Sequence, residues 1–315
     1  QAHKAFIILS IPQYEETFLP NFRNGDVVVL YERNNGTDNV TNKMVFKGNI
    51  ESITDNELRI RLRAAQQNPL VFPENSRYAV EHDTMDTTFR SMYLGLSSFM
   101  DANPERRELL LGQRPPRFDM AYEDRIARTT DDFERVALKA EAACDYFLLV
   151  GPPGTGKTSR ALRRMVEHFY ACPSTQVLLL AYTNRAVDEI CRSLSAILPQ
   201  VDYIRVGSEL SCDARFRKHL LENVLAECNN RREVNIRMAD CRIYVGTVAS
   251  IASKPELFKL KHFDVAIVDE ATQILEPQLL GILCARFKDG RNGIGKFILI
   301  GDHKQLPAIV YDHQS

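Results

Sequence analysis

A glycine-rich stretch, GPPGTGKTS at residues 151–159, constrains the fold of this 315-residue chain more than any other feature. It follows the apolar run YFLLV (146–150) and precedes the helix-like run SRALRRMVEHFY. The pattern Gly-x-x-x-x-Gly-Lys-Thr between a strand and a helix is typical of a phosphate-binding loop. The alternative is a plain Gly/Pro turn, but the complete pattern in this context favours phosphate binding.

The residue types of this loop suit a nucleoside triphosphate and Mg²⁺, so we expect ATP and Mg²⁺ as cofactors. Glycines let backbone N–H groups close around phosphates at the helix N-terminus. Lys157 would reach the β- and γ-phosphates, and the Thr158 hydroxyl would hold Mg²⁺. The candidate nucleotide ligands are Gly151, Pro152, Pro153, Gly154, Thr155, Gly156, Lys157, Thr158 and Ser159.

Short apolar runs alternate with helical patterns from residue 146 to the end of the sequence. Continuous apolar strands with helices between them indicate a parallel sheet covered on both faces. We therefore predict an α/β domain over residues 146–315. Its expected strands are 146–151, 176–183, 201–207, 241–247, 263–270 and 296–302.

The first 145 residues have a different pattern, which predicts two further parts. Runs rich in β-formers, separated by polar turns, indicate a small β-barrel over residues 1–85. A helical period then follows, is interrupted near Pro104, and resumes after the linker-like GQRPPRF. Residues 86–145 are therefore expected to form a helical stalk and linker. The expected barrel strands are 26–32, 42–53, 56–63 and 77–83.

Two expected strand ends carry side chains that complete a nucleotide-hydrolysing site. In VAIVDEATQ, Asp269 suits a Mg²⁺ contact and Glu270 suits a base that orients the attacking water. In GDHKQLP, Asp302 and Gln305 end the next strand, and Gln305 could contact the γ-phosphate. The alternatives are solvated acids and a polar loop before a proline. Together with the phosphate loop, we expect Lys157, Asp269, Glu270 and Gln305 to be catalytic.

Five stretches appear in the order of motifs I, Ia, Ic, II and III of superfamily 1 helicases: GPPGTGKT, AYTNRAVDEI, VGTVAS, VDEATQ and GDHKQLP. Their wording resembles the branch that includes the up-frameshift RNA helicases and the replication helicase/nucleases. The resemblance implies a RecA-like ATPase domain that follows a small β-barrel on a helical stalk. It also implies an ATP-dependent helicase or translocase that acts on single-stranded nucleic acid, with DNA favoured over RNA and a monomeric state.

By the same resemblance, Thr183, Asn184 and Thr247 would face the nucleic-acid backbone. Short hydroxyl and amide side chains suit phosphate contacts that carry no sequence information. Thr183 and Asn184 could instead cap a helix. Tyr182, where the family often has Pro or Ser, could stack on a base or simply pack.

The chain departs from the family pattern in two respects. The family usually has a Gln about 17 residues before the loop, which reads adenine; here that position is Glu134. An ionised Glu accepts hydrogen bonds but cannot donate one, so we expect weak base selectivity. The second motor domain, with its arginine finger, would follow residue 315, so we expect this chain to be the first half of a longer enzyme.

The amino-acid composition excludes only a few functional classes for this protein. Residues 146–315 carry 22 Lys+Arg against 18 Asp+Glu, a net +4 that weakly favours a polyanionic ligand. The seven cysteines include no Cys-x-x-Cys, which argues against a zinc ribbon and suits a reducing cytosol. No apolar run approaches the roughly 18 residues of a membrane span, so we expect a cytoplasmic location, or a nuclear one in a eukaryote. A P-loop kinase, an unrelated ATPase and a nucleotide-binding scaffold remain open.

Overall fold

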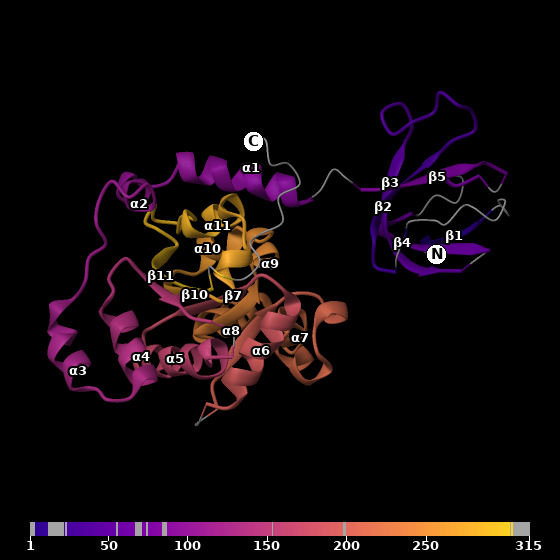
Figure 1. Ribbon diagram of the computed structural model, residues 1–315. Coiled ribbons are helices and arrows are strands. Elements are labelled where there is room, and N and C mark those ends of the chain that lie inside the picture. The colour runs from indigo at the N-terminus through magenta and orange to yellow at the C-terminus, as the bar shows by residue number, and fades with distance from the viewer. Residues whose placement is uncertain are drawn as a thin grey trace. The chain divides into compact units, whose positions relative to one another are not determined.

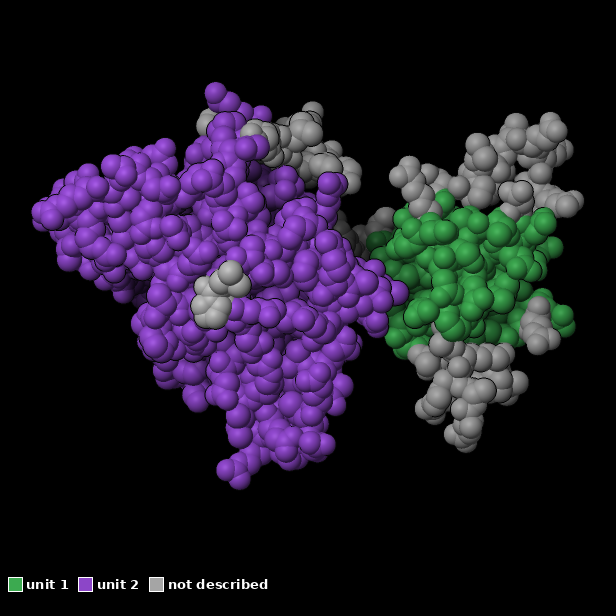
Figure 2. Space-filling model, turned by 90° about the horizontal axis from the view of Figure 1, so that it is seen from below, with its two compact units in different colours: residues 1–86 green, residues 87–315 purple. Residues whose placement is uncertain are grey.

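The computed structural model describes residues 4–11, 22, 24–54, 56–66, 71–73, 75–83, 87–152, 154–197, 200–302 and 304. The chain forms two compact units, residues 1–86 and 87–315 (Figure 2). Across the described residues no helix is long and apolar enough to cross a membrane.

Unit 1 is built on an antiparallel sheet of five strands in the order β1-β4-β3-β2-β5. Its core cluster is Val28, Ile50, Leu58 and Ile60. Strand β4 alternates buried apolar and exposed polar residues, whereas residues 28–31 of β2 are all buried. The sequence predicted a small β-barrel here, and the described strands form an antiparallel sheet in which β1 and β5 are the outer strands of the pairing. Strand β1 was not predicted as a strand. The strands are β1 Lys4–Ser10, β2 Val27–Glu32, β3 Val45–Ile53, β4 Glu57–Gln66 and β5 Tyr78–His82.

Unit 2 contains a parallel sheet of six strands in the order β6-β11-β10-β7-β9-β8 (Figure 1). This confirms the predicted α/β, RecA-like fold. The strand order places the ends of β6, β11 and β10 side by side, and those of β7 and β9 next to them. The strands are β6 Tyr146–Val150, β7 Val177–Ala181, β8 Tyr203–Val206, β9 Ile243–Thr247, β10 Phe263–Val268 and β11 Ile294–Gly301.

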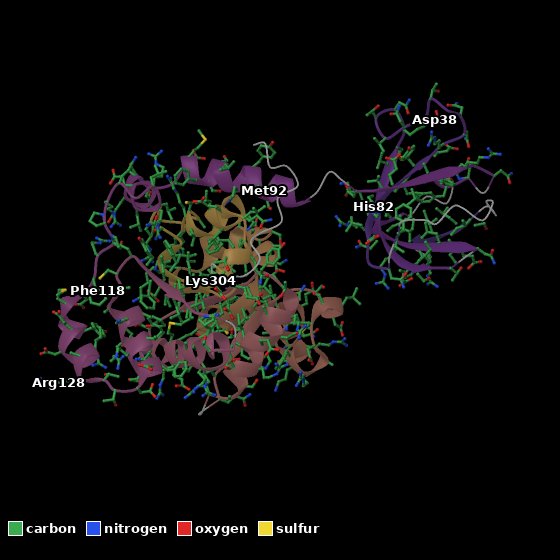
Figure 3. All side chains as sticks on the ribbon, viewed as in Figure 1. Asp38, His82, Met92, Phe118, Arg128 and Lys304 are labelled. Carbon is green, nitrogen blue, oxygen red and sulfur yellow. The ribbon has the colours of Figure 1, made fainter. Side chains whose placement is uncertain are left out.

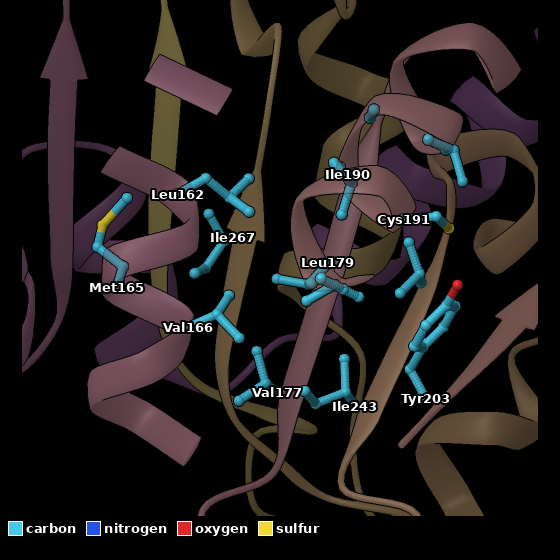
Figure 4. Packing of buried hydrophobic residues seen from close by; sticks show 14 of the residues in the cluster. Leu162, Met165, Val166, Val177, Leu179, Ile190, Cys191, Tyr203, Ile243 and Ile267 are labelled. Carbon is cyan, nitrogen blue, oxygen red and sulfur yellow. The ribbon is translucent and has the colours of Figure 1, made fainter. Parts of the chain in front are cut away.

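Helices cover both faces of this sheet, as Figure 1 shows. On β7, Val177 and Leu179 face one core while Leu178 and Leu180 face the other, so all four are buried. Figure 4 shows the first of these cores, where Leu162, Met165 and Val166 pack on the strands. The helices of unit 2 are α1 Thr87–Met100, α2 Pro104–Leu110, α3 Glu123–Arg128, α4 Asp132–Ala142, α5 Arg163–Ala171, α6 Asn184–Ser195, α7 Leu221–Ala226, α8 Arg231–Asp240, α9 Val248–Ala252, α10 Glu256–Leu260 and α11 Glu276–Leu283.

The helices that precede β6 belong to the same compact unit as the parallel sheet. Helix α1 lies so close to α11 that a Cβ on Gly95 would be 1.8 Å from the Pro277 carbonyl oxygen. The buried Arg106 of α2 donates from Nη2 to the carbonyl oxygens of Ile294 and Gly295, at 2.7 and 2.9 Å. These contacts fasten the stalk helices to the sheet and to α11.

Candidate nucleotide-binding site

The predicted phosphate loop connects β6 to a π-helical turn, Lys157–Leu162, that continues as α5. Gly154 and Gly156 have φ of 77° and 81°, in the left-handed region that glycine adopts without strain. The carbonyl oxygen of Gly156 accepts hydrogen bonds from the N–H groups of Arg160 and Ala161, which starts the helix. The loop therefore has the strand–loop–helix geometry that the sequence predicted; Pro153 lies outside the described residues.

The Lys157 side chain lies across this loop. Its ammonium donates to the carbonyl oxygens of Gly151 and Pro152, the latter at 2.8 Å. The Thr155 hydroxyl also donates to Pro152, at 2.8 Å. Carbonyl oxygens carry no net charge, so a phosphate bound at the loop would compete with them for the Lys157 ammonium.

Asp269 follows β10 and meets the phosphate loop directly. Its Oδ2 accepts a hydrogen bond of 2.5 Å from the Thr158 hydroxyl, and its Oδ1 accepts one of 2.9 Å from the Glu270 N–H. The Asp269 N–H donates to Leu180 at 2.8 Å, which ties the strand end to β7. Asp269 is buried, and burial raises the pKa of its carboxyl group. The structure thus brings together two candidate metal ligands that lie 111 residues apart in sequence.

The pair of Thr158 and Asp269 fits a magnesium ion. Mg²⁺ takes oxygen ligands, typically one or two carboxylates plus substrate phosphates and waters. Among the residues that the structure describes, no group of three or more His, Cys, Asp or Glu side chains could hold a metal by itself. A site with one hydroxyl and one carboxylate therefore suits an ion that arrives with its nucleotide.

Glu270 lies beside Asp269 with an unusual backbone. Its φ of 53° is the one positive value among the described non-glycine residues. Such a conformation costs energy and clusters at functional sites, so it is consistent with a side chain held for a task. Burial, and then the charge of Asp269, raise the pKa of the Glu270 carboxyl group. A raised pKa makes this carboxylate a stronger proton acceptor.

The end of β11 packs against the turn that follows Glu270. A Cβ on Gly301 would lie 2.8 Å from Cγ2 of Thr272, so a larger residue would push this turn away. Asp302 is buried, and its Oδ1 accepts a hydrogen bond of 2.9 Å from the N–H of Lys304. Lys304 is labelled in Figure 3. Gln305, the predicted γ-phosphate contact, lies outside the described residues.

The predicted nucleic-acid contacts lie at the carboxyl ends of β7 and β9, which are neighbours in the sheet. Thr183 is the N-cap of α6, since its hydroxyl accepts from the Ala186 N–H at 3.1 Å. Thr247 is the N-cap of α9, accepts from the Ser250 N–H at 3.0 Å and is buried. Asn184 is half-buried, whereas Tyr182 is exposed. The capping alternative is therefore present in the structure, and the nucleic-acid role stays a prediction.

Glu134 has partners that sequence reasoning missed. Its carboxylate lies 3.0 Å from Arg164 Nε and 3.0 Å from His168 Nε2, both on α5. The other ring nitrogen of His168 lies 3.2 Å from Glu141. Hydrogen bonding to Glu141, and then to Glu134, raises the pKa of His168 although burial opposes it. The i, i+4 spacing of Arg164 and His168 could have indicated that both face one neighbour.

Comparisons with known proteins show what the chain is similar to. A family model described as an AAA domain (AAA_11) matches residues 129–243 and 230–313. The DNA replication ATP-dependent helicase/nuclease DNA2 of Bos taurus is 26% identical over 327 residues, which cover 93% of this chain and 29% of that protein. DNA2 of Xenopus laevis is 37% identical over 179 residues, or 53% of this chain and 15% of that protein. The putative ATP-dependent RNA helicase ECM32 of Saccharomyces cerevisiae is 28% identical over 244 residues, or 65% of this chain and 21% of that protein. The chain thus spans less than a third of the length of these relatives.

Proposed function

Because this chain belongs to the AAA_11 family of AAA domains, and its resemblance to superfamily 1 helicases is confirmed, we propose that it is an ATP-hydrolysing motor that moves on single-stranded nucleic acid. The observation that carries this proposal is the 2.5 Å hydrogen bond between Thr158 of the phosphate loop and Asp269. It joins two motifs at one point, next to Lys157 and Glu270. A kinase or an unrelated ATPase would explain the loop but not the order of the five motifs.

The residues divide the work by their chemistry. The Lys157 ammonium leaves the loop carbonyls and neutralises the β- and γ-phosphates, while the loop N–H groups bind the remaining oxygens. Thr158 and Asp269 would hold Mg²⁺, which supplies further charge neutralisation when bound. Glu270 orients the attacking water and takes its proton, and its raised pKa suits that role. Gln305 would contact the γ-phosphate.

We further propose that the chain acts as the first of two motor domains. The relatives that it matches are more than three times as long as their matched parts, which leaves room for a second RecA-like domain with an arginine. An arginine of this kind contributes roughly 10³–10⁵ in rate in related phosphate chemistry. The 315-residue chain should therefore bind Mg–ATP but turn it over slowly.

Single-stranded DNA is the polymer that we favour. Two of the relatives above have DNA replication in their names, and one is named as a putative RNA helicase. Thr183 would donate its hydroxyl proton to a backbone phosphate, since its oxygen already accepts from Ala186. Thr183→Val should weaken binding to DNA and RNA oligonucleotides alike, whereas Tyr182→Ala tests base stacking. Equal affinity of wild type and Thr183→Val for both polymers would exclude this contact.

The motor proposal itself is tested in two steps. Mg–ATP binding to the 315-residue chain should be lost in Lys157→Ala, with circular dichroism as the control for folding. Strand displacement should then require ATP in a protein that extends past residue 315. If Lys157→Ala binds Mg–ATP as the wild type does, the site assignment is wrong. Binding without any strand displacement would favour the nucleotide-binding scaffold instead.

A further inference from the structure

One face of the sheet in unit 1 carries a row of arginines. Along β4 the residues Leu58, Ile60 and Leu62 are buried, whereas the residues between and after them are exposed. Because side chains alternate between faces along a strand, the exposed set shares one outer face. That set contains Arg59, Arg61 and Arg63.

The neighbouring strand β1 adds apolar side chains to this face. Phe6 pairs with Arg61 and Ile8 pairs with Arg59 in the antiparallel register. The guanidinium carbons of Arg59 and Arg61 lie 4.6 and 5.0 Å from the centre of the Phe6 ring. Ile8 is 59% exposed, which is unusual for a large apolar side chain between charged ones. The arginines, Phe6 and Ile8 form what we call the arginine face.

The charge of this face differs from that of the rest of the unit. Residues 1–86 carry 9 Lys+Arg against 12 Asp+Glu, a net −3, yet three of the nine cations line up on β4. Glu51 pairs with Arg59 at 2.7 Å and with Arg61 at 2.9 Å, and Glu57 lies at the start of β4. No carboxylate in the described part of the chain forms an ion pair with Arg63. The face therefore keeps a positive charge on a negative domain.

We propose that the arginine face binds the backbone of single-stranded nucleic acid, as a second contact region besides the strand ends of unit 2. The choice of nucleic acid as the ligand rests on the proposed motor function. Guanidinium groups bind phosphate oxygens bidentately, and aromatic rings bind bases by stacking in a sequence-tolerant way. Phe6 is half-buried, so a base would have to reach its ring beside Arg59 and Arg61. Phe6 and Ile8, flanked by Arg59 and Arg61, offer both kinds of contact within one pair of strands.

A purely structural reading makes a different prediction. Charged side chains commonly protect an edge strand such as β1 from pairing with other chains. In that case the arginines would cover Phe6, and their removal would change solubility but not nucleic-acid binding. The two readings differ in how affinity responds to salt.

The test is fluorescence anisotropy of a labelled oligothymidylate with the 315-residue chain, without nucleotide, at several salt concentrations. Each phosphate contact contributes about 0.7 to the slope of log affinity against log salt for a single strand. Arg61→Ala/Arg63→Ala should therefore lower the slope by about 1.4. The ratio of wild-type to variant affinity should therefore change roughly 25-fold for each tenfold change in salt concentration. Arg61→Lys/Arg63→Lys should retain most of the slope.

Two further variants separate the contributions. Phe6→Leu should lower the affinity and leave the slope unchanged, because it removes stacking and not charge. Arg77→Ala removes one positive charge from unit 1 just before β5, at the opposite sheet edge from β1, and should change neither the affinity nor the slope. Unchanged binding in the double alanine variant, or an equal loss in Arg77→Ala, would overturn the proposal. A wild-type chain that binds Mg–ATP but no oligothymidylate would overturn the motor function as well.

Discussion

Replacing Glu134 by glutamine should give the nucleotide site a preference for adenine that the wild-type chain lacks. Glu134 lies in the first turn of α4, 17 residues before Gly151, where relatives in the resembling family read adenine with a glutamine. Its carboxylate lies 3.0 Å from Arg164 Nε and 3.0 Å from His168 Nε2, and an ionised carboxylate can only accept hydrogen bonds. Glutamine can donate and accept at once. One added neutral hydrogen bond is worth about 0.5–1.5 kcal/mol, so ATP should gain roughly 2- to 12-fold over GTP.

The substitution should cost little stability. Arg164 and Glu134 are 47% and 30% exposed, so their ion pair is of the surface type and contributes about 0–1 kcal/mol to the free energy of unfolding. His168 is more buried, and its pKa is raised by Glu141 first and Glu134 second. A raised folded-state pKa stabilises the fold below the unfolded value near 6.5, and this stabilisation is lost as pH rises through the folded value. In Glu134→Gln this pH dependence should shrink but persist, because Glu141 remains.

The assay compares the affinities of ATP, GTP and CTP for wild type and variants by titration calorimetry, with thermal melting at pH 6 and pH 8. Glu141→Gln is the matched control, because it also removes a carboxylate from His168 but lies away from the base-reading position. It should change the pH dependence of melting and leave the nucleotide ratios alone. A wild-type preference for ATP above tenfold, about 1.4 kcal/mol, would mean that another residue reads the base. An unchanged ratio in Glu134→Gln would mean that Glu134 does not face the base.

Three further outcomes are expected. Thr158→Val should weaken Mg–ATP binding roughly 10- to 100-fold, because valine offers Mg²⁺ no hydroxyl ligand and leaves Asp269 without its hydroxyl partner. Thr158→Ser should bind nearly as wild type, and equal affinities of wild type and Thr158→Val in a calorimetric Mg²⁺ titration would refute this. Gly95→Ala should lower the melting temperature of unit 2, since the new Cβ would lie 1.8 Å from the Pro277 carbonyl oxygen. Gly207→Ala is the control and should not lower it, because a Cβ there has nothing within 4 Å. Indistinguishable melting curves for the two variants would show that the packing of α1 does not depend on the Gly95 contact. In a protein that extends past residue 315, Gln305→Ala should leave nucleotide affinity within roughly tenfold of wild type and slow unwinding more strongly, because a neutral hydrogen bond contributes only about 0.5–1.5 kcal/mol; unwinding at the wild-type rate would exclude Gln305 as the γ-phosphate sensor.

The parallel sheet was predictable because each of its strands needs only a short apolar segment, which is visible in the local sequence. A strand covered on both faces needs a continuous apolar run, and Val177–Ala181 is buried at every position. The expected strands accordingly overlap β6 to β11 and differ from them by at most two residues at either end. Strand β1 was missed because its short apolar run, residues 4–10, has no alternation or turn to distinguish it from a buried helix segment.

The attachment of the stalk to the sheet had no local signal at all. Arg106 is a charged residue in a polar helix, and only the fold brings it to the Ile294 carbonyl, 188 positions along the chain. In the sequence Gly95 is only a residue of low helix propensity, and its close approach to Pro277 is known only from the structure. Contacts of this kind depend on tertiary packing, which the periodicity of one segment cannot express.

The proximity of the two proposed metal ligands was predictable for a different reason. Phosphate transfer restricts which side chains can serve, so Thr158 and Asp269 were identifiable from type and order before the sheet placed them 2.5 Å apart. The positive φ of Glu270 was not, because nothing in its neighbours requires that conformation. Chemistry thus fixes the identity of site residues, while backbone geometry is decided by the surrounding fold.

The two readings of Thr183, helix cap and phosphate contact, turn out to be compatible. A cap uses the hydroxyl oxygen as an acceptor for the Ala186 N–H, which fixes the side chain and leaves the hydroxyl proton available. Thr183 is also exposed at the N-terminus of the twelve-residue α6, where the helix dipole favours an anion. Thr247 differs, since it is buried and its oxygen lies 2.7 Å from the Ser250 hydroxyl, which can take that proton. Of the two threonines, Thr183 is therefore the one whose geometry suits a direct backbone contact, and Thr247 the one that chiefly holds α9 on β9.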